Sequence, residues 1–191
     1  MCAGHYWVCG PRCEFLMMIG RTRMNDLGIV DNSAVCLCRE MNSPVGRLAI
    51  HGEGDFLLAI DFMPILAGKP LAQDRTPVLL EAERQLHAYF SRELNSFDLP
   101  LMPRGTAFQL AVWQAMLDIP FGQTLTYGEL AEAVGGRNKA RAVGQAANKN
   151  PLPIVIPCHR VIGAGNTLTG FGSGIDKKAI LLNLEQGADV W

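Results

Sequence analysis

The sequence predicts a mixed α/β (α+β) protein, in which a small N-terminal domain of one sheet and a helix precedes a mostly helical C-terminal domain with a helix-turn-helix. Short apolar runs separated by turn residues come first, and apolar residues with helical spacing follow. A proline-rich stretch at residues 99–105 breaks both periods and is the predicted linker. We expect a poorly ordered leader over residues 1–30, an N-terminal domain over residues 31–102 and a C-terminal domain over residues 106–191.

The composition is that of a folded protein, because 49% of the 191 residues are hydrophobic. No apolar run approaches the length of a membrane span, and the N-terminus lacks a secretory signal. We therefore expect a soluble intracellular protein, cytoplasmic in a bacterium or nuclear in a eukaryote, whose six cysteines are reduced thiols. The leader cysteines and histidine could hold zinc in principle, but their spacing matches no common finger, and we predict no metal and no cofactor. These leader residues are Cys2, His5, Cys9 and Cys13.

Residues 34–37, 47–50 and 56–62 are apolar runs between turn signals, and they predict three strands in a meander. Thr76 is the expected N-cap of a helix with Pro77 at its first position. That helix should cover the sheet with one apolar face. The residues of this face are Leu79, Ala82, Leu86, Tyr89 and Phe90.

The C-terminal domain begins with a capping-box pair, Thr106 and Gln109, and the helix that follows should end at Phe121-Gly122. Its predicted buried stripe is Phe108, Val112, Ala115 and Ile119.

A second capping box, Thr126 with Glu129, predicts a short helix that ends at the glycine pair of residues 135–136, and Asn138 should cap the next helix. Two short helices joined by a glycine turn are typical of a helix-turn-helix that lies in a DNA groove, although many helix pairs in enzymes look similar. The expected inner face of the first helix is Tyr127, Leu130, Ala131 and Val134. The second helix should pack through Ala142, Val143, Ala146 and Ala147 and expose Arg141, Gln145 and Asn148.

No acidic side chain lies between Ala133 and Ile175, although the formal net charge of the chain is only -1. This window predicts a local anion-binding surface, and an ordinary solvated face is the alternative. Its basic residues are Arg137, Lys139, Arg141, Lys149 and Arg160.

Residues 150–161 place Cys158 beside His159 in an apolar, proline-stiffened segment that we expect to be a strand. A buried thiol needs a base to become a nucleophile, and a neutral histidine oriented by a carboxylate can supply one. Glu185 lies at the edge of the buried face of the last helix, whose apolar stripe is Ile180, Leu181 and Leu184, and is the expected partner of His159. Asp176 is better explained as the cap of that helix, which Gly187 closes. The alternative is an inert buried cysteine.

The segment Ile156-Pro157-Cys158-His159-Arg160-Val161 closely resembles the active-site motif of the O6-alkylguanine-DNA alkyltransferases, also called methylated-DNA–protein-cysteine methyltransferases. The resemblance is strong over residues 106–187, whereas residues 34–100 match only in their strand pattern and in the Ser43-Pro44-Val45-Gly46 start. Further segments match in family order and with similar spacing, namely residues 126–131, 140–144, 150–151, 169–171 and 177–185.

This resemblance implies a DNA repair protein that moves an alkyl group from O6-alkylguanine to its own Cys158 in a single turnover. His159 would act as the base through a bridging water, Glu185 would orient it, Asn150 would hold the active-site turn, and Tyr127 would donate a hydrogen bond to the guanine. The base would rotate out of the duplex, and Arg141 would fill its place. The predicted DNA-contacting residues are Tyr127, Gly128, Asn138, Arg141, Gln145 and Ser173. The implied partner of the monomer is duplex DNA with O6-alkylguanine, and O4-alkylthymine is a further candidate.

The loop of residues 170–174 departs from the family pattern, because its only hydroxyl is on Ser173, one position away from the serine of some relatives. Its small Gly172 and Gly174 could admit alkyl groups larger than methyl. Two other classes of protein share part of this pattern. A non-catalytic alkyltransferase-like damage sensor would lack Cys158, and a cysteine hydrolase would have no use for the Arg141 helix.

Overall fold

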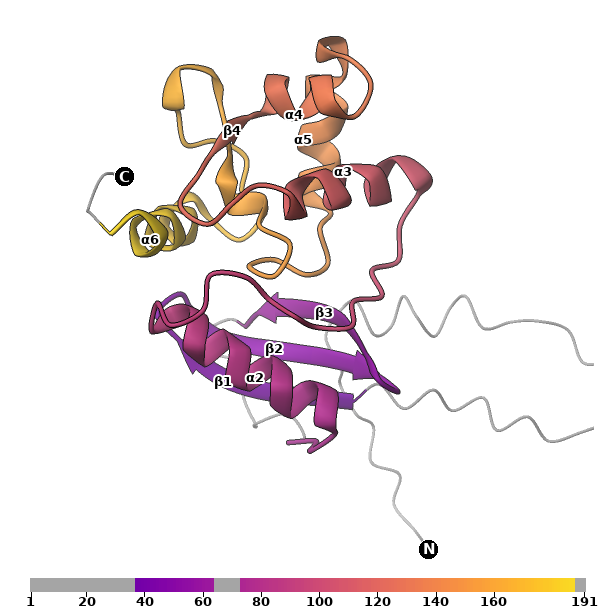
Figure 1. Ribbon diagram of the computed structural model, residues 1–191, viewed down its shortest axis with the longest axis vertical. Coiled ribbons are helices and arrows are strands. Elements are labelled where there is room, and N and C mark those ends of the chain that lie inside the picture. The colour runs from indigo at the N-terminus through magenta and orange to yellow at the C-terminus, as the bar shows by residue number, and fades with distance from the viewer. Residues whose placement is uncertain (1–36, 64–72, 188–191) are drawn as a thin grey trace, which may run out of the picture. The chain divides into compact units, whose positions relative to one another are not determined.

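The computed structural model describes residues 37–63 and 73–187, and its compact unit spans Leu37–Trp191 (Figure 1). The predicted leader at residues 1–30, with its zinc alternative, lies outside the described residues. Within the described ranges, no helix has the length and apolar character needed to cross a bilayer.

Three antiparallel strands form the N-terminal sheet in the order β1 (Leu37–Ser43), β2 (Gly46–Glu53) and β3 (Phe56–Phe62). The predicted meander is therefore confirmed, and the third strand has the predicted bounds. The first strand was predicted over residues 34–37, of which only Leu37 lies within the described residues, and the described strand continues beyond the predicted end to Ser43. The tight connection between Ser43 and Gly46 explains the difference, since Gly46 takes a φ of 101° and lets the pairing run up to the turn.

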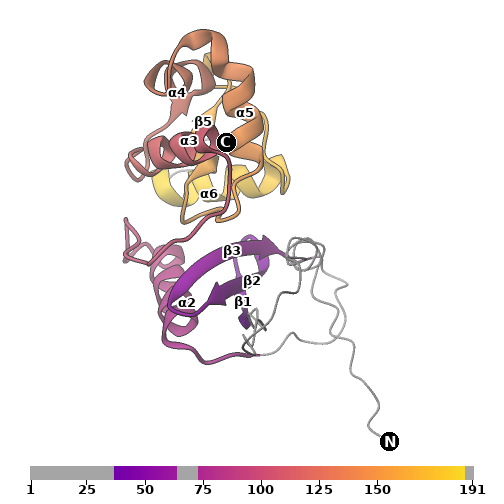
Figure 2. The same cartoon turned by 90° about the vertical axis from the view of Figure 1, so that its right-hand side faces the viewer.

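The helix α2 (Pro77–Phe90) lies across one face of the sheet, as Figures 1 and 2 show. Its buried side chains include four of the five predicted residues, and Phe90 is half-buried. Thr76 stands at the N-cap as predicted, but its side chain makes no capping hydrogen bond, and its hydroxyl is buried without a partner among the described residues.

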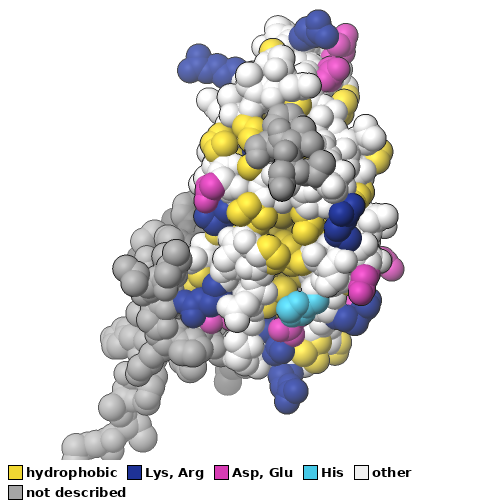
Figure 3. All heavy atoms as spheres, turned by 90° about the vertical axis from the view of Figure 1, so that its left-hand side faces the viewer, with side chains coloured by type: hydrophobic (Ala, Val, Ile, Leu, Met, Phe, Trp, Pro, Cys, Tyr) yellow, Lys and Arg dark blue, Asp and Glu magenta, His cyan; other side chains and the backbone are white. Residues whose placement is uncertain are grey.

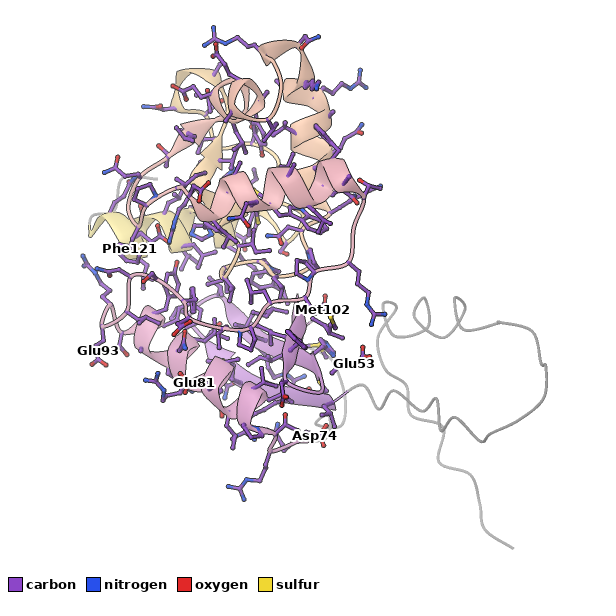
Figure 4. All side chains as sticks on the ribbon, turned by 45° about the vertical axis from the view of Figure 1, so that its right-hand side comes forward. Glu53, Asp74, Glu81, Glu93, Met102 and Phe121 are labelled. Atoms are coloured by element: carbon purple, nitrogen blue, oxygen red, sulfur yellow. The ribbon has the colours of Figure 1, made fainter. Side chains whose placement is uncertain are left out.

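The predicted linker is partly paired with the sheet. Pro100 accepts a hydrogen bond from the Leu57 N–H (2.8 Å), and the Met102 N–H donates to the Leu57 carbonyl (3.0 Å), so Leu101 forms a bridge beside β3 (Figure 4). The Ile60 N–H donates to the Pro151 carbonyl (2.9 Å). Backbone groups at the edge of β3 are thereby satisfied by the C-terminal half of the chain.

The helix α3 (Ala107–Leu117) starts with the predicted capping box of Thr106 and Gln109. It ends at Leu117 rather than at Phe121-Gly122, because Pro120 has no N–H and disfavours helical geometry in the residue before it. Of the predicted stripe, Val112 and Ile119 are buried, whereas Phe108 and Ala115 are only half-buried. The remaining core positions of the helix are Trp113 and Met116.

The helix-turn-helix consists of α4 (Tyr127–Ala133), the 3-10 turn η1 (Arg137–Lys139) and α5 (Ala140–Asn148), with the predicted capping box at Thr126 and Glu129. The glycines at 135 and 136 both have positive φ and make the turn. Two details of the prediction are wrong. Asn138 lies inside η1 and Lys139 holds the N-cap position, because the chain enters α5 through a 3-10 turn. Ala142 is exposed, and the buried residues of α5 are Val143, Ala146 and Ala147.

Residues 150–157 form turns instead of the predicted strand, because Pro151, Pro153 and Pro157 have no N–H for a ladder and Ile154 takes a φ of 77°. The 3-10 turn η2 (Cys158–Arg160) follows and leads into β5 (Val161–Ile162), which pairs in parallel with β4 (Leu125–Thr126). A third 3-10 turn, η3 (Ala164–Asn166), comes next.

The last helix is α6 (Ile175–Gln186), and Gly187 closes it in the left-handed conformation, as predicted. Gly174 occupies its N-cap, so Asp176 lies within the first turn rather than at the cap. Ile180 was predicted on the buried stripe but is 40% exposed. The buried face instead carries two charged residues, and its members are Lys178, Leu181, Leu182 and Glu185.

The two threonine N-caps give a matched stability test. The Thr106 hydroxyl accepts from the Gln109 N–H, and we expect Thr106→Ala to lower the free energy of unfolding by about 1 kcal/mol. Thr76→Ala removes a buried hydroxyl that has no partner among the described residues, so its effect should stay within about 0.5 kcal/mol of zero. Urea unfolding of both variants checks this, and equal losses would contradict it.

Candidate active site

The turn η2 brings Cys158 and His159 into the interior, where they are 7% and 0% exposed. The segment before them is held by Asn150, whose side-chain amide donates to the Ile156 carbonyl (2.8 Å) and whose side-chain oxygen accepts from the Leu152 N–H (3.0 Å). Asn150 also hydrogen-bonds to the Cys158 sulfur. One buried amide thus fixes the turn and stabilises the thiolate form.

His159 and Glu185 are in direct contact, as the sequence predicted. The distance between His159 Nε2 and Glu185 Oε1 is 2.7 Å, and both side chains are fully buried. This contact assigns the ring proton to Nε2. The other ring nitrogen, Nδ1, is buried and has no hydrogen-bond partner within residues 37–63 and 73–187. A neutral ring in this tautomer leaves Nδ1 free to accept a proton.

The Glu185 carboxylate receives hydrogen bonds from four residues. Besides His159, these are the Tyr89 hydroxyl (2.7 Å), Arg160 through Nε (2.9 Å) and Nη2 (3.0 Å), and the Gly122 N–H (3.0 Å). Burial alone would raise the pKa of Glu185, but the hydrogen bonds and charges of His159 and Arg160 outweigh it and lower the pKa to about 2. The group is therefore a carboxylate at neutral pH.

Arg160 was predicted to contribute to an anion-binding surface, and the structure corrects this. The side chain is 7% exposed, pairs with Glu185, and donates through Nη1 to the Ile119 carbonyl. Its guanidinium carbon also lies 5.8 Å from the centre of the Phe121 ring. Arg160 therefore neutralises an internal carboxylate. On the face drawn in Figure 3, the Lys and Arg side chains lie in separate groups with hydrophobic side chains between them.

Burial acts on the thiol and the imidazole in opposite directions. It raises the pKa of Cys158, and the hydrogen bond from Asn150 and the charge of Lys178 offset only part of this rise. Burial also lowers the pKa of His159, against the opposing effect of Glu185. The resting pair is therefore a neutral thiol and a neutral imidazole. Proton transfer between them leaves the net charge of the site unchanged.

Lys178 supplies a buried cation beside the thiol. Its side chain is fully buried, and Nζ donates to the carbonyls of Val161 (2.6 Å) and Thr169 (2.7 Å). Burial lowers its pKa to about 8, against the raising effect of the Cys158 charge. The ammonium ion stabilises the thiolate and at the same time holds the chain on either side of η3.

Tyr127 connects the helix-turn-helix to this site. Its hydroxyl donates to the carbonyls of Gly170 (3.0 Å) and Thr169 (3.3 Å), and a methyl group on Gly144 of α5 would contact its ring at 3.7 Å. Burial, and then the charge of Cys158, raise the pKa of Tyr127 to about 12, so the phenol stays a hydrogen-bond donor. The loop of residues 170–174 therefore lies against Tyr127, and Ser173 in this loop is half-buried.

The other predicted DNA-contacting residues lie on the outside of the helix-turn-helix, away from the buried cluster. Arg141 and Gln145 are exposed on α5, Asn138 is exposed on η1, and Gly128 is half-buried on α4. The structure thus assembles Cys158, His159, Glu185, Asn150 and Tyr127 into one site and leaves Arg141 on a separate outer surface.

Three residues of the site were missed by sequence reasoning alone. Arg160 was assigned to a surface although it directly follows His159 in the sequence. Lys178 could have been found from its spacing of seven residues from Glu185, because this spacing puts both residues on one face of the helix. Tyr89 gave no signal, because it fits the apolar stripe of α2. Within the described part of the chain, no group of three or more His, Cys, Asp or Glu side chains is arranged to hold a metal ion.

Comparisons with known proteins agree with this geometry. The family model for the 6-O-methylguanine DNA methyltransferase DNA binding domain matches residues 107–187, and the model for the ribonuclease-like domain of the same proteins matches residues 36–103. The chain is 46% identical over 149 residues to a methylated-DNA–protein-cysteine methyltransferase of Methanosarcina acetivorans, which covers 75% of this chain and 94% of the relative.

A second relative with the same name, from Mycobacterium leprae, is 45% identical over 152 residues and covers 78% of this chain and 92% of its own length. Among solved structures, Mycobacterium tuberculosis OGT in complex with DNA matches with a TM-score of 0.72 and 44% identity, over 80% of this chain and 96% of that one. The chain therefore belongs to the 6-O-methylguanine DNA methyltransferase family.

Proposed function

We propose that this protein repairs alkylated DNA by transferring the alkyl group of O6-alkylguanine to the sulfur of its own Cys158. The observation that carries the proposal is the buried His159 ring, which bonds to Glu185 through Nε2 and leaves Nδ1 free to accept a proton, one residue after the buried Cys158. The names of the relatives support methyl transfer from DNA to a protein cysteine.

The transfer is a displacement at the alkyl carbon. The Cys158 thiol gives its proton to His159 Nδ1 through a bridging water, and the thiolate forms a bond to the carbon as the bond between that carbon and guanine O6 breaks. A hydrogen bond from Tyr127 stabilises the negative charge that develops on the base as the bond breaks. The base becomes neutral guanine when it takes up, through water, the proton that the thiol gave to His159.

The product is a thioether, and the residues around Cys158 offer no means to hydrolyse it. The protein is therefore consumed, one molecule for each lesion, and it needs no cofactor. This distinguishes it from a cysteine hydrolase, which turns over repeatedly. The presence of Cys158 distinguishes it from a non-catalytic damage-binding module.

The target base must leave the duplex to reach this buried sulfur. We propose that α5 lies in the minor groove and that Arg141 fills the space that the base vacates. Tyr127, Gly128, Asn138, Gln145 and Ser173 would contact the DNA around it. The exposure of Arg141 and Gln145 on α5 supports this arrangement, and the DNA complex of the Mycobacterium tuberculosis relative supports DNA as the partner.

Several finer points belong to the same proposal. The chain acts as a monomer, in the cytoplasm of a bacterium or the nucleus of a eukaryote, and O4-alkylthymine is a second substrate. Residues 31–102 and 106–191 are its two domains, and the reaction needs no metal.

Incubation with a duplex that contains O6-methylguanine should add one methylene to the Cys158 peptide, in proportion to the protein present. Mass spectrometry of the digested protein measures this. Cys158→Ala should gain nothing and still bind the duplex, whereas Cys38→Ala, which removes the other free cysteine of the described chain, should react like the wild type. An unmodified Cys158 in excess damaged duplex would refute the proposal.

Arg141→Ala should slow single-turnover transfer from duplex DNA by about 10- to 100-fold, because the cost of a flipped base, a few kcal/mol, is no longer offset. Transfer from the free base O6-methylguanine should change less than about twofold. Arg84→Ala is the control, since Arg84 is exposed on α2 and pairs with Glu81 of the same helix. Equal slowing on both substrates would contradict the role of Arg141.

Lys178→Met should raise the pKa of Cys158, because a cation that stabilises the thiolate is lost. Transfer at neutral pH should slow by about tenfold for each pKa unit gained, and the slowed rate should recover as the pH rises. Lys177→Met, a change at the partly exposed neighbour, is the control. The measurement is the single-turnover rate as a function of pH. An unchanged midpoint of this pH profile in Lys178→Met would exclude the electrostatic role.

A further inference from the structure

We propose that Tyr89, in the N-terminal half of the chain, is a positioning residue for the transfer reaction, because its hydroxyl holds the Glu185 oxygen that orients His159. The expected effect on alkyl transfer rests on the proposed function. The physical basis of the inference is the geometry of four buried groups.

The contact lies at the centre of the Glu185 network. The Tyr89 hydroxyl donates to Glu185 Oε1 at 2.7 Å, and the same oxygen binds His159 Nε2 at 2.7 Å and Arg160 Nη2 at 3.0 Å. The Tyr89 oxygen also lies 3.5 Å from His159 Nε2. Tyr89 and His159 therefore share one acceptor atom.

Tyr89 is held in this position by packing and remains a hydrogen-bond donor at neutral pH. The side chain is fully buried, and its ring packs against Phe90 and Phe97 with centroid distances of 5.3 Å each and against Phe121 at 6.0 Å. Burial and the negative charge of Glu185 raise its pKa well above the usual value. The phenol therefore does not compete for the proton that His159 accepts.

The hydroxyl affects the histidine in two ways. It fixes the rotation of the carboxylate, so that Oε1 faces Nε2 and Nδ1 faces away. It also takes part of the negative charge of Oε1 and thereby limits how strongly Glu185 stabilises a protonated His159. The charged groups that face this imidazole are Glu185, Arg160 and Lys178. Arg160 also donates to Oε1, and Tyr89 adds a neutral donor to the same oxygen.

The test is Tyr89→Phe, which removes the hydroxyl and keeps the ring. A larger truncation would be uninformative, because it would also remove the ring that packs against Phe90, Phe97 and Phe121. We expect single-turnover transfer from duplex O6-methylguanine to slow by about tenfold at neutral pH, the effect of losing one hydrogen bond to a charged group. The acid limb of the pH profile should move to higher pH, because His159 now gains a proton more easily.

Phe90→Leu is the matched control, since it removes a ring that packs on Tyr89 and leaves the hydroxyl in place. It should lower stability in urea and leave the midpoint of the pH profile where it is in the wild type. A transfer rate and midpoint in Tyr89→Phe equal to those of the wild type would overturn the proposal, and so would the same shift in Phe90→Leu.

A second measurement separates this inference from the proposed function. Nitrogen-15 NMR of the His159 ring needs no DNA, and His159→Gln identifies its signals. We expect the Nε2 resonance or the titration midpoint to change in Tyr89→Phe and not in Phe90→Leu. If the wild type transferred no alkyl group but these signals changed, the function would be wrong and the coupling of Tyr89 to His159 would stand; unchanged signals would overturn the coupling itself.

Discussion

The structure depends on one buried carboxylate. An ionised side chain inside a protein is tolerated only when donors replace the water it has lost, and Glu185 receives them from Tyr89, His159, Arg160 and Gly122. These partners come from α2, from η2 and from the loop after α3, while Glu185 itself lies on α6. The loss of any one partner would leave negative charge uncompensated in the interior. Glu185 therefore determines both the packing of these four segments and the protonation state of His159.

This constraint also orders the chemistry. Glu185 fixes the proton of His159 on Nε2 and leaves Nδ1 as the base, and Lys178, seven residues earlier on the same helix face, acts on the Cys158 sulfur. A single helix therefore supplies the anion for the imidazole and the cation for the thiol. Burial disfavours both charged products of proton transfer, and these two partners, together with Asn150, reduce that penalty on each side.

Sequence reasoning succeeded where the deciding interactions are local. The capping boxes at Thr106 and Thr126, the glycine turn at 135–136 and the closing glycine at 187 depend on neighbours within a few residues. It failed where local signals conflict or where a distant group takes part. Asn138 lost its cap position to a 3-10 turn, and the segment before Cys158 became a set of turns because its prolines cannot pair and Pro151 instead accepts a hydrogen bond from β3.

The sequence by itself determined the order of the elements, the helix-turn-helix and the succession of Cys158 and His159, because each depends on residues that are adjacent or one helical turn apart. It also singled out Glu185, since a carboxylate beside a buried helix face needs a partner. Only the tertiary structure decided that Arg160 is internal, that Lys178 lies beside the thiol and that Tyr89 reaches the carboxylate. These contacts join residues up to 96 positions apart, and no local period or spacing encodes which distant side chains share one buried charge.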